Sequence, residues 1–413
     1  MGSAMRSSGL ILAGWCSLVL ALIACGCRGE RPPYVPPPEA NTVAAPVAPV
    51  GGQDAAAPPG YGPNDVGSVP VRPCTGARAS GIAVLCVRPG DKTRTATIGA
   101  AVKAAKSGDV IQVSAGTYAE DVLIQDKALT LAGGFDEKFT KRALSTNETH
   151  IKGSGKNSVV RVVAEGKTVQ IDGFTITGGT GDPGSARSGA GINSAGANAT
   201  LSNNRIVQNR PTPASIHMTD TRGGGILANG SKRTVVSILN NVIDDNASGR
   251  GAGIASSGVG KLVVRGNAVR KNRGYSDHGG GLFIDSPDAE ISANLIDGNE
   301  IGPTANPYGY GGGVYLHSVG TVVRMSFNII TNNVAVTVGS GVFVDNGAHA
   351  TLTRELIYGN KCTEAGGAAI TVDSTDDAHP VGSVIKVECE GPDADHCMAA
   401  LEKLAADKFG EKD

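Results

Sequence analysis

An internal repeat fills the middle of this 413-residue chain and constrains its fold more than any other feature. A glycine-rich corner recurs seven times, with spacings of 34, 28, 28, 32, 28 and 28 residues between its first positions. A second signature, Asn-x-Ile/Val-x-x-Asn, follows in phase. Two phased signatures predict a solenoid in which each repeat adds one coil. The corners begin at Ser188, Arg222, Arg250, His278, Tyr310, Val338 and Gly366.

The segments between the corners alternate with period two, which indicates short β-strands rather than helices. Examples are ILAN after Arg222, LFID after His278, and KLVVRG at 261–266. Glycine, at 59 residues, and asparagine tolerate the left-handed backbone that sharp corners need. We therefore predict an all-β parallel β-helix of about 28 residues per coil. The asparagine columns are interpreted as hydrogen-bond ladders that hold the turns.

Several segments resemble right-handed parallel β-helix proteins of the pectin-lyase-like superfamily. They are AGTYAE at 115–120, the GGFD to GFTITGG passage at 133–179, and the two phased signatures. The resemblance covers about residues 95–390 and implies the fold rather than one activity. That superfamily includes polysaccharide lyases, hydrolases, epimerases, esterases and proteins without catalysis. Because the other motifs of those enzymes are missing from the sequence, Gly116, Tyr118 and Glu120 are expected to be structural.

The first 24 residues have the organisation of an export signal. Arg6 precedes a short apolar run, and Leu22 to Cys25 resembles a lipobox, so residues 1–24 are predicted to be removed and Cys25 to carry lipid. Residues 25–73 are rich in proline and alanine and are predicted to form an extended tether. The resemblance implies a bacterial envelope protein anchored by lipid, in the outer membrane or on the cell surface. A net charge of −1 excludes a general field for nucleic acid.

The ends of a solenoid need covers, because unpaired strand edges recruit other chains. Residues 74–108 are predicted to hold a Cys74–Cys86 disulfide and a capping helix over 95–107. The β-helix follows at 109–390, and residues 391–413 are expected to form a second capping helix. Cys389 and Cys397 are candidates for a further disulfide. With both ends covered, we expect a monomer.

Aligned positions in successive coils lie about 4.8 Å apart, so columns of side chains can form a site. Counting each corner's first residue as zero, positions +4 and +6 should point inward and +5 and +7 outward. The zero column and the aromatic residues of the +5 column are predicted to bind ligand; they are Arg222, Arg250, His278 and Tyr310, and Phe283, Tyr315 and Phe343. The +7 column adds Asp285, His317 and Asp345.

Insertions before the corners, at 210–221 and 300–309, should stack as loops over the same face. Tyr275 and Tyr308 lie in or near such loops and join the predicted ligand-binding set. Residues 205–273 contain 11 basic and 3 acidic residues. This local excess predicts a basic cleft that attracts an anionic ligand.

Two functions follow from these columns. The favoured interpretation is a lipid-anchored protein that binds acidic polysaccharide or a surface partner, without catalysis and without a cofactor. The alternative is a polysaccharide lyase or epimerase that acts on uronates, in which His278, Tyr310 or His317 removes a proton. In that case Asp285 and Asp345 would orient His317 or hold Ca²⁺.

Overall fold

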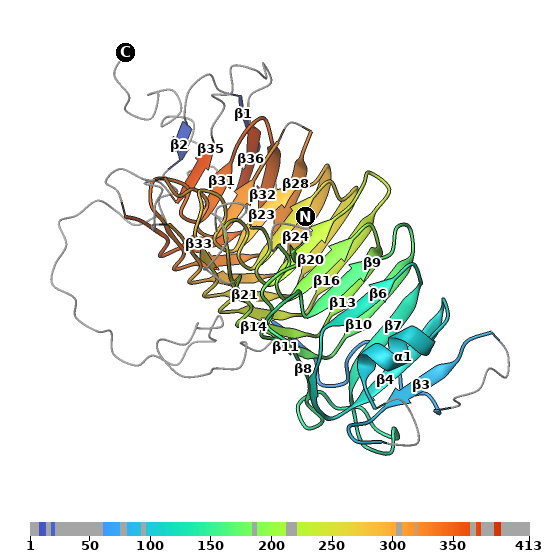
Figure 1. The fold of residues 1–413 in the computed structure, drawn as a ribbon. Coiled ribbons are helices and arrows are strands. Elements are labelled where there is room, and N and C mark those ends of the chain that lie inside the picture. Colours follow the sequence, from blue (N-terminus) through green and yellow to red (C-terminus); the bar gives the residue numbers. More distant parts are fainter. Residues whose placement is uncertain are drawn as a thin grey trace, which may run out of the picture.

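The chain forms an elongated solenoid of stacked parallel strands in a computed structural model (Figure 1). The structure describes residues 61–74, 81–91, 96–183, 188–211, 221–302, 308–318, 320–363 and 369–372, with the backbone alone at 8–13, 18–20 and 384–389. Within these residues the strands form four sheets, named A to D here, and every pairing between coils is parallel. The predicted all-β parallel β-helix is confirmed.

Each coil contributes one strand to sheets A, B and C, and some coils add a short strand to sheet D. Sheet A has the order β1-β36-β32-β28-β24-β20-β16-β13-β10-β7-β4-β3, with β1 Ser8–Ala13, β36 Val384–Cys389, β32 His349–Thr353, β28 Val322–Ser326, β24 Asp288–Ser292, β20 Lys261–Arg265, β16 Val235–Leu239, β13 Asn198–Ser202, β10 Thr168–Asp172, β7 Leu129–Phe135, β4 Asp109–Ser114 and β3 Val84–Val87. Sheet B has the order β2-β35-β31-β27-β23-β19-β15-β12-β9-β6, with β2 Leu18–Leu20, β35 Ile370–Val372, β31 Val342–Val344, β27 Val314–Leu316, β23 Leu282–Asp285, β19 Ile254–Ser257, β15 Ile226–Asn229, β12 Ile192–Ala195, β9 Val160–Val163 and β6 Val122–Gln125. Sheet C has the order β33-β29-β25-β21-β17-β14-β11-β8-β5, with β33 Leu356–Tyr358, β29 Ile329–Thr331, β25 Leu295–Asp297, β21 Ala268–Arg270, β17 Val242–Asp244, β14 Arg205–Val207, β11 Thr175–Thr177, β8 Thr149–Lys152 and β5 Gly116–Ala119. Sheet D consists of β18 Ala247–Ser248, β22 Arg273–Gly274, β26 Glu300–Ile301, β30 Val334–Ala335 and β34 Lys361–Cys362.

The alternation of apolar residues builds one continuous core along the solenoid. In sheet B, Ile226 pairs with Ile254, and Ile254 pairs with Leu282, each 28 residues further along the chain. These +4 positions and the +6 positions, such as Ala228, are buried in the core as predicted. The +5 positions point the other way, into a separate cluster on the outer face of sheet B.

Two ladders of buried asparagines hold the turns that flank sheet C, as predicted. In the first ladder, Asn241 Nδ2 donates to Asn267 Oδ1, and Asn267 Nδ2 donates to Asn294 Oδ1, both at 3.0 Å. Each Nδ2 also donates to a backbone carbonyl of the preceding coil, for example from Asn267 to Ile238 at 2.8 Å. Buried amides and carbonyls at these corners are thus paired without loss of regular stacking.

The helix α1 (Ile98–Ala104) covers the N-terminal end of the solenoid, where it contacts β3, β4 and β6. Thr97 caps its N-terminus. The carboxylate of Glu120 accepts hydrogen bonds from the backbone N–H groups of Ile98 and Gly99 at 2.8 and 2.7 Å. Tyr118 is buried and donates to Ser114 O at 3.1 Å, and burial raises its pKa to about 12. The Gly-x-Tyr-x-Glu segment is therefore structural, as expected.

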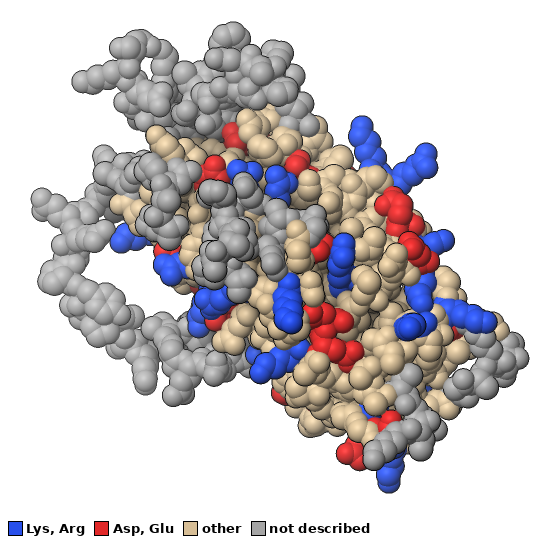
Figure 2. All heavy atoms as spheres, viewed as in Figure 1, with Lys and Arg blue, Asp and Glu red and all other residues tan. Residues whose placement is uncertain are grey.

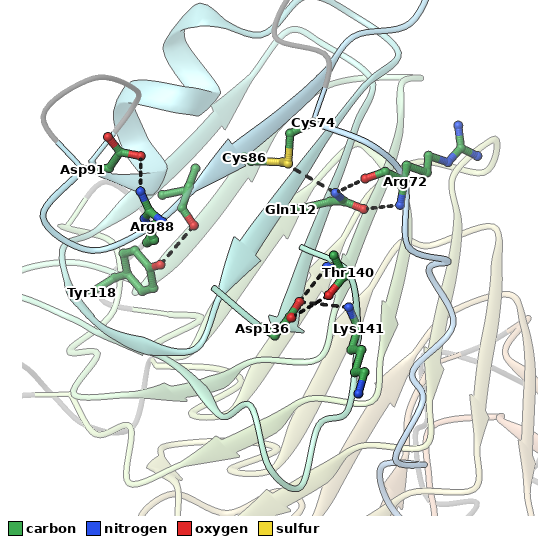
Figure 3. Close-up of a disulfide and its surroundings, with 11 residues drawn as sticks. Arg72, Cys74, Cys86, Arg88, Asp91, Gln112, Tyr118, Asp136, Thr140 and Lys141 are labelled. Atoms are coloured by element: carbon green, nitrogen blue, oxygen red, sulfur yellow. Dashed lines mark hydrogen bonds and ion pairs between the residues drawn. A yellow bond between two sulfur atoms is a disulfide. The ribbon is translucent and has the colours of Figure 1, made fainter. Parts of the chain in front are cut away.

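The disulfide between Cys74 and Cys86 is present, with a Cα–Cα distance of 5.7 Å (Figure 3). Beside it, Gln112 makes two hydrogen bonds with the backbone of Arg72. Its Oε1 accepts from Arg72 N at 2.8 Å, and its Nε2 donates to Arg72 O at 2.7 Å. The disulfide therefore ties the preceding segment to the first coils.

Residues 61–74, named the strap here, lie against the solenoid, so the predicted tether of 25–73 is wrong in its last part. Gly62 N donates to Gly266 O, while Ser68 Oγ donates to the carboxylate of Asp172. Val69 is buried in the same apolar cluster as Phe135 and Phe139. The strap thus links coils that are far apart along the solenoid.

The predicted C-terminal helix at 391–413 and Cys397 lie outside the described residues, as do Cys25 and the side chain of Cys389. Strands β1 and β2 fall within the predicted signal peptide and pair antiparallel with β36 and β35. This pairing is seen in the full-length chain, with residues 1–24 present. The removal of these residues stays a prediction. Within the described part of the chain, no helix is long and apolar enough to cross a membrane.

Candidate functional site

The zero column lies on consecutive rungs beside sheet B. The backbone of Arg222 forms a parallel β-bridge with that of Arg250, and the backbone of His278 forms one with that of Tyr310. Gly251 N also donates to His278 O at 3.2 Å, which connects the two pairs. The corners therefore align as the repeat spacing predicts, and all four side chains are partly buried.

The aromatic residues of the +5 column stack on one another. The ring centroids of Phe283 and Tyr315 are 5.6 Å apart, and those of Tyr315 and Phe343 are 5.2 Å apart. The three residues are only 1%, 1% and 3% exposed. These rings, which are predicted to bind ligand, therefore do not offer open faces to one.

Glycines explain why the rings are buried. A Cβ built on Gly311 would lie 2.9 Å from Tyr315 Cβ, and one on Gly339 would lie 2.7 Å from Phe343 Cβ. Both glycines also have a positive φ, 69° and 63°. The space beside the +1 glycines, where a Cβ would lie, is filled by the rings themselves, so it is not open to a ligand.

His278 and Arg222 cover these rings from the side of the corners. The His278 ring meets Tyr315 edge-on, with centroids 4.4 Å apart. The Arg222 guanidinium lies 5.5 Å from the centroid of Phe283, which is a cation–π distance. The predicted site residues are thus brought together, but as layers, with charged groups outside and rings beneath.

Asp277 is the residue that the predicted set misses. Its Oδ1 lies 2.5 Å from His278 Nδ1 and 3.3 Å from Arg250 Nε, and Ser276 Oγ donates to it at 2.6 Å. Burial opposes its ionisation, but the hydrogen bonds and the nearby His278 and Arg250 charges outweigh burial and lower the pKa of Asp277. The sequence signal that could have identified Asp277 is an acidic residue directly before the zero position in one coil only.

The +7 column forms a second acid–histidine pair. Asp345 Oδ2 lies 3.7 Å from His317 Nδ1, and Asn346 Nδ2 links the two, donating to Asp345 Oδ2 at 2.9 Å and lying 3.1 Å from His317 Nδ1. Asp345 also accepts a hydrogen bond from the buried Tyr315 hydroxyl. Burial and the adjacent Asp345 charge raise the pKa of Tyr315 well above its usual range. Asp285 is apart from this pair, since its partner among the described residues is Ser257 Oγ at 3.4 Å. The predicted triad therefore reduces to His317 and Asp345.

A metal site does not emerge from these carboxylates. No group of three or more His, Cys, Asp or Glu side chains within the described residues has the geometry to hold an ion. Within this part of the chain, Asp285 and Asp345 therefore do not form the Ca²⁺ site that the enzyme alternative allows.

Tyrosines occupy the rim of the cluster. Tyr308 and Tyr310 stack in parallel with centroids 6.4 Å apart, and Tyr308 is 53% exposed. Tyr310 in turn lies 5.2 Å from Phe343. Tyr275 is partly buried three residues before His278, and none of the ring pairs among the described residues includes it. Residues 212–220 and 303–307 of the two predicted binding loops lie outside the described residues.

Five arginines of the 205–273 stretch pair with acids of adjacent coils, so its excess of positive charge is partly compensated, and the anionic ligand stays a prediction. Arg250 pairs with Asp277, Arg270 with Asp244, and three further arginines are paired in the same way. Figure 2 shows basic and acidic side chains interspersed over the visible face of the solenoid. The further pairs are Arg210–Asp245, Arg265–Glu290 and Arg273–Glu300.

Comparison with known proteins identifies the fold. The family model described as a right handed beta helix region matches residues 141–385. No curated protein matches the chain. The fold is similar to that of the pectate lyase Pel9A, with 16% identity, 70% of this chain and 74% of that chain covered, and a TM-score of 0.42. It is also similar to pectin methylesterases from Aspergillus niger (14% identity, 69% and 85% covered, TM-score 0.30) and carrot (16%, 71% and 89%, TM-score 0.31). The chain belongs to the right-handed β-helix family.

Proposed function

We propose that this protein binds acidic polysaccharide on the outer face of sheet B and is held in the bacterial cell envelope by lipid on Cys25. The observation that carries the proposal is the cluster of two acid–histidine pairs over stacked rings, Asp277–His278 and His317–Asp345. Such a mixture of polar and aromatic groups on successive rungs suits a linear polymer that lies along the solenoid.

The accessible groups have distinct tasks in this proposal. Tyr308 offers an exposed ring for the apolar face of a sugar, and Tyr310 supports it from below. Arg250 donates to a uronate carboxylate, while Asp277 holds the guanidinium and the His278 ring in place. Phe283, Tyr315 and Phe343 form the rigid base on which these groups rest.

Titration with polygalacturonate and with a neutral polysaccharide tests this proposal. Tyr308→Ala should weaken binding of both polymers, because stacking does not depend on charge. Arg250→Ala should weaken only polygalacturonate, by about tenfold or more, since a hydrogen bond to a charged group contributes about 1.5–3 kcal/mol. Tyr358→Ala is the matched control, because Tyr358 is 43% exposed on sheet C. Parent-like affinity of Tyr308→Ala and Arg250→Ala for both polymers would refute the site.

A second candidate function, uronate elimination, is favoured by the Asp277–His278 pair alone. With Nδ1 turned to Asp277, His278 Nε2 can accept the C5 proton of a uronate. The C5–H electrons form a C4=C5 double bond, the C4–O bond breaks, and the leaving oxygen takes a proton. Appearance of ultraviolet-absorbing unsaturated uronates, lost in His278→Gln, would establish this reaction over simple binding.

A further inference from the structure

A groove lies on the outer face of sheet C, away from the sheet B cluster. It has a volume of about 620 Å³. Its floor is formed by β8, β11 and β14, one wall by the loop before β8, and its roof by residues 61–65 of the strap. A space of this size lies within the range of small-molecule sites, about 300–1,000 Å³. The groove is therefore large enough for a short oligosaccharide.

The roof of the groove is fixed in place by bonds to three parts of the solenoid. Gly62 N donates to Gly266 O at 2.9 Å, and Asn64 Nδ2 donates to Asn203 Oδ1 at 3.1 Å. Ser145 N donates to Asp65 Oδ1 at 2.8 Å. A groove with a fixed roof is formed before a ligand arrives, which lowers the entropy lost on binding.

The floor presents polar side chains in a row. His150, Thr175 and Arg205 are paired in register on three adjacent strands and all line the groove. His150 Nε2 lies 3.0 Å from Glu148 Oε2. Arg205 is exposed, and no carboxylate among the described residues pairs with it, unlike Arg210, which pairs with Asp245. Arg205 thus places a guanidinium in this groove that a ligand can bind.

The roof supplies an aromatic side chain opposite these polar groups. Tyr61 lines the groove and is partly buried, and Pro63 lies beside it on the strap. Two carboxylates also line the groove, and both are engaged: Asp65 accepts from Ser145 N, and Glu148 lies 3.0 Å from His150 Nε2. The remaining groups, an aromatic ring, hydroxyl and imidazole groups and the Arg205 guanidinium, suit a sugar that carries a carboxylate. A guanidinium binds a carboxylate through two parallel hydrogen bonds.

We propose that this groove is a second ligand site, for a short saccharide that carries a carboxylate. Arg205 binds the carboxylate, Tyr61 packs against the sugar ring, and Thr175 and His150 bind hydroxyl groups. The strap then has a role in recognition as well as in stability.

Isothermal titration calorimetry of the full chain with trigalacturonate tests the proposal, with maltotriose as the neutral probe. Arg205→Ala and Tyr61→Ala should each weaken trigalacturonate binding at this site by tenfold or more. Arg205→Lys keeps the charge but not the paired donors, and it should show a smaller loss. Arg233→Ala, at an exposed arginine elsewhere, is the matched control and should bind like the parent. Melting curves of each variant verify that the fold is intact.

The outcomes separate this groove from the sheet B site. Loss in Arg205→Ala with parent-like binding at this site in Arg250→Ala supports the groove. Parent-like affinity and stoichiometry in both Arg205→Ala and Tyr61→Ala overturns it, whatever Arg250→Ala does. Absence of trigalacturonate binding by the parent, or equal binding of maltotriose, also overturns it. Loss in Arg250→Ala alone assigns the saccharide to the sheet B cluster.

Discussion

Removal of one asparagine from the middle of a ladder should destabilise the whole solenoid strongly. Asn267 is fully buried. Its Oδ1 accepts hydrogen bonds from the N–H and the Nδ2 of Asn241, at 2.9 and 3.0 Å. Its Nδ2 donates to Ile238 O at 2.8 Å. Asn267→Ala therefore removes the partner of the Asn241 backbone N–H, of one of the two Asn241 Nδ2 hydrogens (the other donates to Leu201 O), and of the Ile238 carbonyl.

The size of the effect follows from these three groups. Each buried polar group left unpaired costs about 1–3 kcal/mol. The three groups together give about 3–9 kcal/mol, and because water can enter part of the space that the side chain leaves, we expect the lower half of this range, about 3–6 kcal/mol. A loss of this size is exceptional for a single substitution.

Urea unfolding followed by circular dichroism measures the loss. Coils contact mainly their neighbours, so both the midpoint and the slope of the transition should be compared with the parent. Asn229→Ala is the matched control, because Asn229 lies exposed at the end of β15 and should change stability by less than about 0.5 kcal/mol. Equal, small losses in Asn267→Ala and Asn229→Ala would refute the ladder as a source of stability.

Two further predictions concern charged groups. Glu355 accepts hydrogen bonds from Asn328 at the end of one ladder, and burial, only partly opposed by these bonds, raises its pKa from 4.5 to about 8. In the unfolded chain this carboxyl ionises at a lower pH than in the folded chain, so stability should fall as the pH rises between these two values. Glu355→Gln should therefore flatten the curve of melting temperature against pH, and an unchanged curve would contradict the raised pKa of Glu355. Asp172→Ala leaves the buried Arg142 guanidinium unpaired and should cost about 3–5 kcal/mol in urea unfolding. Chymotrypsin cleavage after Tyr61 should then accelerate as the strap loosens, and an unaltered rate would contradict the anchoring role of Asp172.

The coil structure could be predicted because each signal is repeated along the chain. The +4 residues Ile226, Ile254 and Leu282 lie in the same core environment of successive coils, so apolar residues recur there every 28 positions. An asparagine ladder likewise needs the same side chain above and below, since Asn267 both accepts from Asn241 and donates to Asn294. Repetition therefore identified both the core face and the turns.

Features that occur once could not be found in this way. The strap depends on single contacts, such as Asn64 with Asn203 and Ser68 with Asp172, in a segment whose proline content indicates an extended chain. Proline does favour an extended backbone, but it does not determine whether that backbone lies in solvent or along a coil. Asp277 is similar, because it has no equivalent in neighbouring coils.

Burial of the aromatic column shows how far alignment can predict a site. The period of two correctly placed Phe283, Tyr315 and Phe343 on the outer face of sheet B. Whether an outward ring is open depends on side chains from other columns, here Arg222 and His278, whose direction the spacing does not determine. Alignment thus predicts neighbours more reliably than exposure.

Charge in a solenoid must be counted across coils rather than along the chain. Most charged residues in a window such as 205–273 are basic, yet Arg265 pairs with Glu290 and Arg273 with Glu300, in the next coil. Residues 25 or 27 positions apart in sequence are adjacent in space because one coil separates them. The same geometry makes an arginine without an acid on the adjacent rungs, such as Arg205, more informative about a ligand than any basic stretch of sequence.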